Sequence, residues 1–596
     1  MTSAINVSLL LLLTFAACGL TAGCSSKHSW RRRMENSLLP AKNSFLFEEA
    51  TISDIQAAFN DGRLTSCQLV QYYLDRITTL NPHLNAVIEI NPDALDDAAK
   101  ADNHLLPAKN SFLFEEATIS DIQAAFNDGR LTSCQLVQYY LDRITTLNPH
   151  LNAVIEINPD ALDDAAKADI QRNAQNHLSP LHGIPVLVKD NINTHDKLNT
   201  TSGSFALLGS IVPRDAGVIQ RLRMAGAIIL GKASMSEWDN FRSQVPPHGW
   251  SPRGGQARNP YSKTKNPCGT SSGSAIAVAA NLVTVSLATD LDGAITCPAV
   301  VNSVVGIKPT VGLTSRSGMV PISPRLQTIG PMARTVADAV ALLDVIVGFD
   351  PLDAEATKAA KKFIPEGGFC KSLKEDGLKG KRIGILRHPY FDIYSMGSME
   401  ANTFAAHFQT MRLKGAILVD NLKMRNAEMM ENLIANGEII LLLAEFKLSL
   451  NAYLKDLVSS SVRSLADVIA FNNNHPIEEN MDEYGQIVFL ASQKTNGIGV
   501  AEKKAIKKMA QLSKEGMEDL IKQKKLDVVV FPEHYASNAM SVGAFPIISV
   551  PAGYNSIGEP FGISFAGLKG SDAILIEIAY AFEQATNVRN PPPTLF

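Results

Sequence analysis

The stretch Asn266–Val300, NPCGTSSGSAIAVAANLVTVSLATDLDGAITCPAV, decides how this chain folds. It opens with a glycine- and serine-rich loop, continues into the small residues 274–280, and ends in a second glycine turn at Gly293. The small residues predict a closely packed helix that begins at the loop. The N-terminal dipole of such a helix favours negative charge at the loop. The stretch therefore predicts a turn, a helix and a second turn around one buried site.

Strand and helix patterns alternate on both sides of this stretch. The strand patterns lie at residues 153–157, 186–189, 227–230, 381–386 and 527–531. This alternation predicts an α/β fold with layers around a largely buried sheet. Residues 438–523 are predicted to be mostly helical, because Ala505, Met509, Leu512 and Leu520 share one helical face. We interpret them as a helical insertion beside the sheet.

An unbroken internal repeat precedes the α/β region. Residues 38–102 recur without change at 105–169, a shift of 67 positions. Repeat folds such as solenoids need three or more diverged copies, so this is not one of them. A recent duplication and a gene-model error both account for the identity. We expect the second copy to belong to the fold, which makes residues 38–104 a surplus duplicate and 105–596 one large domain.

Each copy encodes two helices. In the second copy the first helix is predicted to be capped at Ser120, and the second at Thr132 with Gln135. Leu136, Tyr140 and Ile144 recur at helical spacing and predict the buried face of the second helix. One fold offers one groove for this face, so the first copy is expected to leave apolar side chains exposed.

The first 24 residues have the pattern of a secretory signal. Residues 7–23 are apolar and end in small residues, whereas a membrane span needs about 20 apolar residues. We expect residues 1–24 to be a signal peptide, no stable membrane span, and a protein that is secreted or in the endomembrane lumen. An uncleaved N-terminal membrane anchor and a buried N-terminal helix are the alternatives.

Composition narrows the classes of partner. The chain has 596 residues, 45% of them hydrophobic, which suffices for a large core. The net charge is −4 and basic residues are scattered, so no nucleic-acid partner is expected. The seven cysteines contain no Cys-x-x-Cys pair, and neither a disulfide framework nor a metal site is predicted. Cys268 and Cys297 are interpreted as small buried residues, with a reactive thiol as the alternative.

The opening stretch resembles the amidase signature of amide-cleaving enzymes. The resemblance extends from about residue 117 to the C-terminus and includes the strings LHGIPVLVKDNINT at 181–194, GKASMSEWDNFRS at 231–243 and GWSPRGGQARNPY at 249–261. The chain is similar to general amidases of plants, fungi and bacteria. Their family includes fatty acid amide hydrolase and the amidotransferase subunit that acts on glutamyl-tRNA. The resemblance implies an α/β/α sandwich with a large mixed central sheet, and no cofactor.

The same resemblance implies a serine nucleophile, a second serine in a cis peptide, a lysine base and an oxyanion hole of backbone N–H groups. Lys189 matches the lysine, whose pKa burial would lower. Thr270, 24 residues before Ala294, matches the cis serine, with Ser271 as the alternative proton relay. Ala294 occupies the position of the nucleophile and has no oxygen. The oxyanion hole matches Leu291, Asp292, Gly293 and Ala294.

Two functions remain open after this comparison. The first is hydrolysis of a small or lipidic carboxamide. The second is an inactive relative that binds amide ligands, or the product of a degenerating gene, because loss of a triad nucleophile costs about 10⁶ in rate in a serine protease. A tRNA-linked transamidase component is disfavoured by the leader and by the lack of a basic surface. The sequence predicts neither the substrate nor the oligomeric state.

Overall fold

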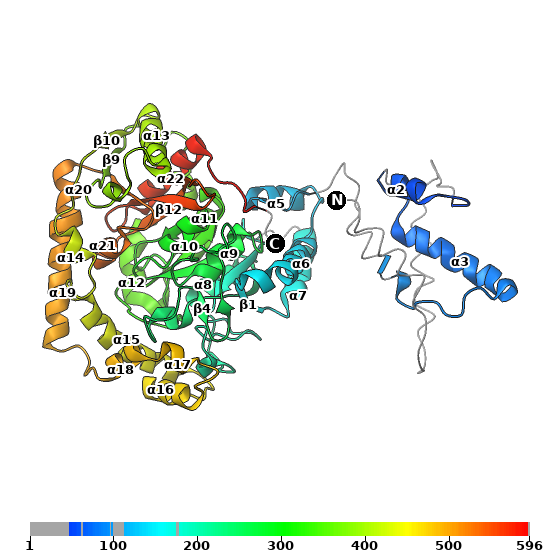
Figure 1. Ribbon diagram of the computed structural model, residues 1–596, viewed down its shortest axis with the longest axis horizontal. Helices are drawn as coiled ribbons and strands as arrows, with labels where there is room; N and C mark the ends of the chain where they lie inside the picture. The colour runs from blue at the N-terminus through cyan, green and yellow to red at the C-terminus, as the bar shows by residue number, and fades with distance from the viewer. Residues whose placement is uncertain (1–46, 61–62, 96, 99–111, 175–177, 594–596) are drawn as a thin grey trace. The chain divides into compact units, whose positions relative to one another are not determined.

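The computed structural model describes residues 47–60, 63–95, 97–98, 112–174 and 178–593 (Figure 1). The chain forms two compact units, Met1–Leu113 and Phe114–Phe596. The predicted signal peptide at residues 1–24 lies outside the described residues, and the domain limits 38–104 and 105–596 remain predictions. In the described part of the chain, no helix combines the length and the apolar character needed to cross a bilayer.

One mixed sheet of 11 strands forms the centre of the larger unit. Its strands stand in the order β1-β3-β2-β6-β8-β7-β12-β13-β11-β9-β10. Their bounds are β1 Val154–Ile157, β2 Pro185–Lys189, β3 Ile228–Ala233, β6 Val285–Asp290, β7 Val305–Lys308, β8 Thr328–Ala333, β9 Arg382–Ile385, β10 Ile417–Val419, β11 Val528–Pro532, β12 Ile547–Tyr554 and β13 Pro560–Ala566. The five predicted strands correspond to β1, β2, β3, β9 and β11.

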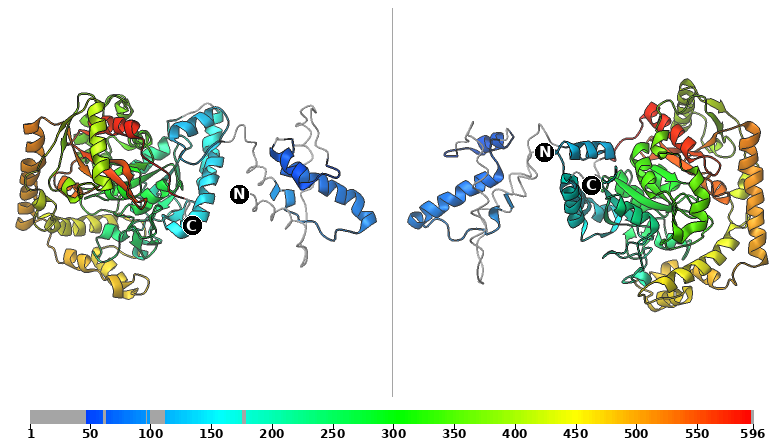
Figure 2. Two further views of the ribbon diagram at one scale, coloured as in Figure 1. Left: turned by 45° about the horizontal axis from the view of Figure 1, so that its top comes forward. Right: turned by 180° about the vertical axis from the view of Figure 1, so that it is seen from behind.

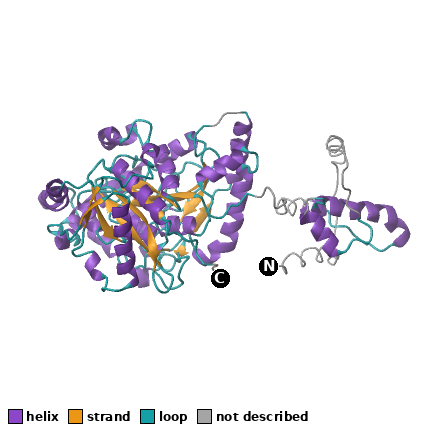
Figure 3. Cartoon of the chain, turned by 90° about the horizontal axis from the view of Figure 1, so that it is seen from above, coloured by secondary structure: helices purple, strands orange, loops and turns teal. Residues whose placement is uncertain are grey.

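Strand direction divides the sheet into three parts. Strands β3, β2 and β6 run parallel near one edge, and β11, β9 and β10 run parallel at the other. The strands between them pair antiparallel. Every residue of β2 and β6 is buried, as expected for central strands covered on both faces. Figure 3 shows helices on both sides of the strands, which confirms the predicted α/β fold with a mixed sheet.

Helices cover the sheet and form the predicted insertion. The helices outside the insertion are α5 Ile119–Asn127, α6 Ser133–Leu151, α7 Ala161–Asn173, α8 Gly217–Met224, α9 Ser272–Ala279, α10 Thr296–Val301, α11 Val336–Ile346, α12 Ala354–Ala360, α13 Met399–Leu413, α14 Ala427–Met430, α21 Ser537–Val542 and α22 Asp572–Thr586. The insertion comprises α15 Glu438–Asp456, α16 Leu465–Asn474, α17 Met481–Tyr484, α18 Ile487–Gln493, α19 Val500–Ser513 and α20 Asp519–Lys524. On α19, Ala505, Met509 and Leu512 are buried as predicted. In both views of Figure 2, α19 lies at the outer edge of this unit.

The second copy of the repeat is part of the larger unit. Leu136, Tyr140 and Ile144 of α6 are 0%, 0% and 3% exposed, as predicted. The capping box of α6 joins Thr132 to Gln135, also as predicted. The predicted cap of α5 at Ser120 is wrong, because the extended backbone of Thr118 lets its hydroxyl accept from the N–H of Asp121 and leaves Ser120 inside the first turn.

The first copy belongs to the smaller unit. It forms α2 Ile52–Asn60 and α3 Ser66–Leu84. One buried apolar cluster of this copy consists of Ile55, Ala58, Leu64 and Leu69. This cluster is small, and α3 leaves Tyr73 48% exposed.

Candidate active site

The residues predicted to act together meet at the carboxyl ends of two parallel strands. Lys189 is the last residue of β2, and Thr289 stands next to the end of β6. Because β2 and β6 are parallel neighbours, both strands end at the same edge of the sheet. Thr270 and the start of α9 lie at this edge too, since α9 packs on both strands. Parallel strands place ligand sites at this end of a sheet.

Lys189 is the centre of a buried polar cluster. Its Nζ atom donates to Asp239 Oδ1 at 2.5 Å, to Thr270 Oγ1 at 2.9 Å and to Thr289 Oγ1 at 2.8 Å. Burial lowers the pKa of the Lys189 amine, and the nearby charge of Asp239 opposes that shift. Three acceptors match the three N–H groups of an ammonium ion. The Lys189 amine is therefore in contact with the Thr270 hydroxyl and with an acidic partner, Asp239, that the sequence analysis did not include.

Thr270 lies where the relay was predicted, although its peptide geometry differs. Its hydroxyl donates to Asp239 Oδ1 at 2.7 Å while it accepts from Lys189. The cis peptide bond of the described residues is His388–Pro389, so the predicted cis geometry before Thr270 is wrong. A trans bond is favoured by about 2.5–4 kcal/mol at a non-proline residue, and from it the hydroxyl already reaches Lys189.

The alternative relay, Ser271, points elsewhere. Its hydroxyl donates to the backbone carbonyl of Thr289 at 3.0 Å, and the residue is 0% exposed. This bond holds the start of α9 against β6. Ser271 thus has a packing role in the structure, and Thr270 is the hydroxyl that contacts Lys189.

The turn after β6 is organised by Asp290. Its carboxylate accepts from the N–H of Gly293 at 3.1 Å and of Ile295 at 2.5 Å, and pairs with Lys308 Nζ at 2.9 Å. The N–H of Gly293 is therefore not directed to a substrate, which corrects one member of the predicted oxyanion hole. Among the described residues, no acceptor bonds the N–H of Leu291 or of Ala294, so these two donors remain for an oxyanion.

Two carboxyl groups near this turn have raised pKa values. Burial raises the pKa of Asp292 to about 6, and the charge of Asp290 adds to the shift. Burial and the charge of Asp292 raise the pKa of Glu438, the first residue of α15, to about 8. With a pKa of about 8, the Glu438 carboxyl is mostly protonated at neutral pH, which removes negative charge near the turn.

Ala294 lies against the loop that carries Thr270. A Cβ atom added to Gly269 would stand 3.6 Å from the Cα atom of Ala294. The backbone at the position that matches the nucleophile is therefore close to the backbone of Gly269, the residue before Thr270. Its methyl side chain supplies no attacking atom.

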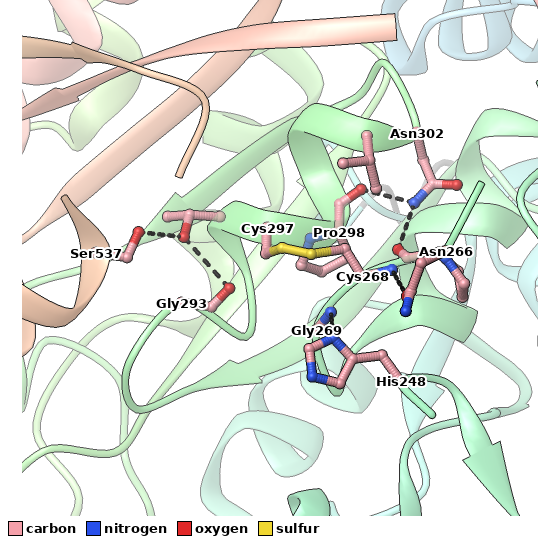
Figure 4. Close-up of a disulfide and its surroundings, with 12 residues drawn as sticks. His248, Asn266, Cys268, Gly269, Gly293, Cys297, Pro298, Asn302 and Ser537 are labelled. Carbon is pink, nitrogen blue, oxygen red and sulfur yellow. Dashed lines mark hydrogen bonds between the residues drawn. A yellow bond between two sulfur atoms is a disulfide. The ribbon is translucent and has the colours of Figure 1, made fainter. Parts of the chain in front are cut away.

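A disulfide between Cys268 and Cys297 ties this loop to α10 (Figure 4). The Cα atoms of the two residues are 5.6 Å apart, which is within the usual range for a disulfide. The prediction of unpaired buried cysteines is wrong, because α10 folds back beside the loop 29 residues after it. On the other side of the loop, the N–H of Gly269 donates to His248 Nδ1 at 3.0 Å. Together these contacts fix the backbone next to Thr270.

Asp239 is the main residue that the sequence analysis missed. It stands in a run of three left-handed residues, Trp238, Asp239 and Asn240, with φ of 48°, 53° and 60°. Left-handed backbone costs about 1–2 kcal/mol per residue outside glycine, and such strain is concentrated at functional sites. Asn191 Nδ2 donates to Asp239 Oδ2 at 2.9 Å. No periodicity marks this turn in the sequence.

The helical insertion supports the turn that carries Asp239. Trp238 is 1% exposed and its ring packs edge-on against Phe489 of α18, with ring centroids 5.7 Å apart. Arg242 forms buried ion pairs with Glu237 at 2.6 Å and with Glu479 at 3.1 Å. Phe489 and Glu479 both come from the inserted region. Movement of the turn would separate these buried charges and leave them unpaired, which is costly. The ion pairs therefore hold the turn in place.

Known proteins resemble this chain over most of its length. The family model described as Amidase matches residues 135–545. The chain belongs to the amidase signature family. It is 57% identical to an Arabidopsis thaliana protein described as "Probable amidase", over 81% of this chain and 92% of that protein. It is 38% identical to a component of the glutamyl-tRNA(Gln) amidotransferase of Chloroflexus aurantiacus, over 51% of this chain and 60% of that one.

A solved structure gives the same assignment. The native peptide amidase of Stenotrophomonas maltophilia superposes with a TM-score of 0.75 at 41% identity, covering 81% of this chain and 99% of that one. An amidase family protein from Bacillus anthracis superposes with the same TM-score at 34% identity, covering 87% and 98%. The chain is therefore an amidase-family hydrolase of amide C–N bonds.

Proposed function

We propose that this amidase-family chain hydrolyses a carboxamide at the cluster around Lys189. The observation that carries the proposal is the contact of 2.9 Å between the buried Lys189 Nζ and Thr270 Oγ1 beside the Ala294 turn. Such a pair can move a proton between an attacking oxygen and a leaving nitrogen. The free N–H groups of Leu291 and Ala294 support stabilisation of the oxyanion.

The substrate class follows from the relatives and is part of the proposal. The Stenotrophomonas maltophilia relative is named a peptide amidase. We therefore expect peptide carboxamides to be accepted, together with small or lipidic carboxamides. No cofactor takes part in this chemistry, because the proton and charge movements can all be performed by side chains and backbone.

Release of ammonia from peptide amides tests the proposal. The variants are Lys189→Met, which removes the amine from a side chain of similar length, and Ala294→Ser, which restores an oxygen at the nucleophile position. We expect turnover by the unmodified chain, faster turnover by Ala294→Ser, and none by Lys189→Met. Absence of turnover in both the unmodified chain and Ala294→Ser would contradict the function.

The second function is an inactive amidase relative that binds carboxamides. Ala294 is the observation that favours it, since this side chain has no nucleophilic atom. It predicts ligand binding by calorimetry without ammonia release, and turnover only in Ala294→Ser. A degenerating gene product would show neither cooperative unfolding nor binding.

We also propose that the protein enters the secretory pathway through residues 1–24 and that residues 38–104 are a surplus duplicate. The apolar run at residues 7–23 supports entry into the secretory pathway, and the unchanged repeat supports the surplus duplicate. N-terminal sequencing of the protein secreted by a eukaryotic host tests the leader, and sequencing of the transcript tests the duplicate.

A further inference from the structure

One hydroxyl in the site is bonded to both an acidic and a basic group. Thr270 Oγ1 donates to Asp239 Oδ1 at 2.7 Å and accepts from Lys189 Nζ at 2.9 Å. A hydroxyl that already donates to a carboxylate can transfer its proton as the oxygen attacks. We propose that Thr270 is the nucleophile of this chain and that Asp239 is its general base. This inference rests on the carboxamide hydrolysis proposed above.

The other hydroxyls near the turn are held away from the charged pair. Ser271 donates to a backbone carbonyl at 3.0 Å. Thr296 and Ser537 are bonded to each other at 2.8 Å, and both are at most 2% exposed. Thr289 accepts from the lysine but is 2% exposed, whereas Thr270 is 9% exposed. Thr270 is thus the hydroxyl that combines contact with both charged groups and access from the edge of the site.

The contacts of Lys189 assign it the role of proton donor. Its Nζ atom has three oxygen acceptors within 2.9 Å, and one of them belongs to the Asp239 carboxylate at 2.5 Å. Each of the three N–H groups of an ammonium ion has an acceptor in this arrangement. A neutral amine has only two N–H groups, so its nitrogen lone pair would be directed at one of the acceptor oxygens. Burial lowers the pKa of Lys189, which helps the ammonium ion to release a proton when a basic nitrogen forms beside it.

The proposed reaction conserves protons and electrons. The Thr270 proton moves to Asp239 while Oγ1 forms a bond to the carbonyl carbon, and the π electrons move to the carbonyl oxygen, which accepts from the N–H of Leu291 and Ala294. The oxyanion then collapses, the C–N bond breaks, Lys189 protonates the leaving nitrogen, and Asp239 returns the proton to Lys189. Water hydrolyses the threonyl ester through the same groups, so the products are a carboxylic acid and an amine.

The turn that carries Ala294 lies close to the loop that carries Thr270. A Cβ atom at Gly269 would lie 3.6 Å from the Cα atom of Ala294, so the two backbones are close together. Alanine leaves no side-chain nucleophile at position 294, so an attacking oxygen has to come from a neighbouring residue.

Active-site labelling of the full chain tests the assignment. The unmodified chain, Thr270→Val, Thr270→Ser and Asp239→Asn are incubated with a fluorophosphonate probe, and the labelled residue is located by peptide mass spectrometry. We expect an adduct on Thr270 in the unmodified chain and on residue 270 in Thr270→Ser. Ammonia release should fall at least about 100-fold in Thr270→Val and about 100- to 10,000-fold in Asp239→Asn.

Thr284→Val is the matched control, since it removes another buried hydroxyl, one bonded to Tyr140 at 2.8 Å, at the opposite end of β6. Its turnover should equal that of the unmodified chain. Undiminished turnover in Thr270→Val, or an adduct on Thr296 or Ser537, would overturn the assignment of Thr270 as nucleophile. The proposed hydrolysis of carboxamides would remain valid. Turnover confined to Ala294→Ser would also overturn it, whereas no turnover in any variant would overturn the proposed function as well.

Discussion

The two copies of the repeat give the same chain segment two different environments. In both copies the second helix has a threonine capping box and a left-handed C-cap asparagine, with φ of 49° at Asn85 and 50° at Asn152. Yet Tyr140 is 0% exposed and its counterpart Tyr73 is 48% exposed. Local sequence therefore determines the helix and its ends, whereas burial is determined by residues elsewhere in the chain.

The strand that follows the helix gives the sharper contrast. Residues 154–157 form β1, paired antiparallel with β3. The same four residues at 87–90 form no strand, and Ile88 is 99% exposed. A helix satisfies its backbone hydrogen bonds internally, while a strand needs a neighbouring strand. The repeat is thus a natural test of which structure is encoded locally.

Deletion of both copies, residues 38–171, should have the largest effect. It removes α5, α6 and β1 from the larger unit, so we expect no cooperative unfolding transition in calorimetry. Deletion of residues 38–104 alone, or of 105–171 alone, should leave a folded protein. The chain without residues 38–104 keeps Ile170 and Gln171, whereas the chain without residues 105–171 has Asn103 and His104 at the same two positions and is otherwise identical. Ile170 is 68% exposed, so this difference should have little effect on folding. Unfolding of one single-deletion chain but not the other would show that the copies are not equivalent.

Substitution of Tyr140 should have the next largest effect. Tyr140→Ala removes a fully buried ring, and we expect a loss of about 3–5 kcal/mol in the free energy of unfolding. The matched variant Tyr73→Ala should change it by less than about 0.5 kcal/mol. Urea unfolding followed by tryptophan fluorescence gives the measurement, because Trp238 is buried in the larger unit. Equal losses for the two variants would mean that both copies pack.

Removal of the helix caps should have a smaller effect. Thr132→Ala loses the bond from the N–H of Gln135 at 3.1 Å, and we expect a cost of about 1 kcal/mol for the larger unit. Thr65→Ala loses the equivalent bond from the N–H of Gln68 at 3.1 Å. We expect this variant to leave the free energy of unfolding of the larger unit unchanged. Hydrogen exchange of the first turn of each helix should speed up in its own variant. A stability loss from Thr65→Ala would contradict the separation of the two units.

The smallest effect concerns a single thiol. Burial, with a hydrogen bond to Asp169 and the charge of Asp169, raises the pKa of Cys134 from 9.0 to about 11. Because the thiolate reacts, alkylation of Cys134 should rise with pH up to about 11, and be about 100-fold slower at pH 8 than that of an unshifted thiol. Asp169→Asn should lower the pKa and speed the reaction. Because the peptides around Cys67 and Cys134 are identical, iodoacetamide labelling is measured in a chain that carries Cys67→Ser. An unchanged alkylation rate in Asp169→Asn would contradict the role of Asp169 in raising the pKa.

The sequence predicted those parts of the fold that depend on local pattern or on the family motif. The strands β2 and β11, the buried face of α6 and the insertion at α15–α20 follow from periodicity. The contact between Lys189 and Thr270 follows from the resemblance. These signals lie within a few residues of one another or within a motif of fixed spacing.

Features that join distant segments could not be predicted in this way. The left-handed turn at Asp239 is held by Phe489 and Glu479, far along the chain, and leaves no periodic trace. The disulfide from Cys268 to Cys297 depends on how α10 folds back. The Gly293 N–H is bonded to the carboxylate of Asp290, which also pairs with Lys308 on another strand. Each results from tertiary packing and not from local propensity.

The disulfide also makes part of the candidate site a closed covalent ring. Cys268 and Cys297, 29 residues apart, enclose α9, β6 and the Ala294 turn between them. A protease cut inside the ring would leave both fragments of the chain joined. The nicked protein would migrate as one band on a gel without reductant and as two bands with it, so a proteolytic cut at the candidate site would be detected only after the disulfide is reduced.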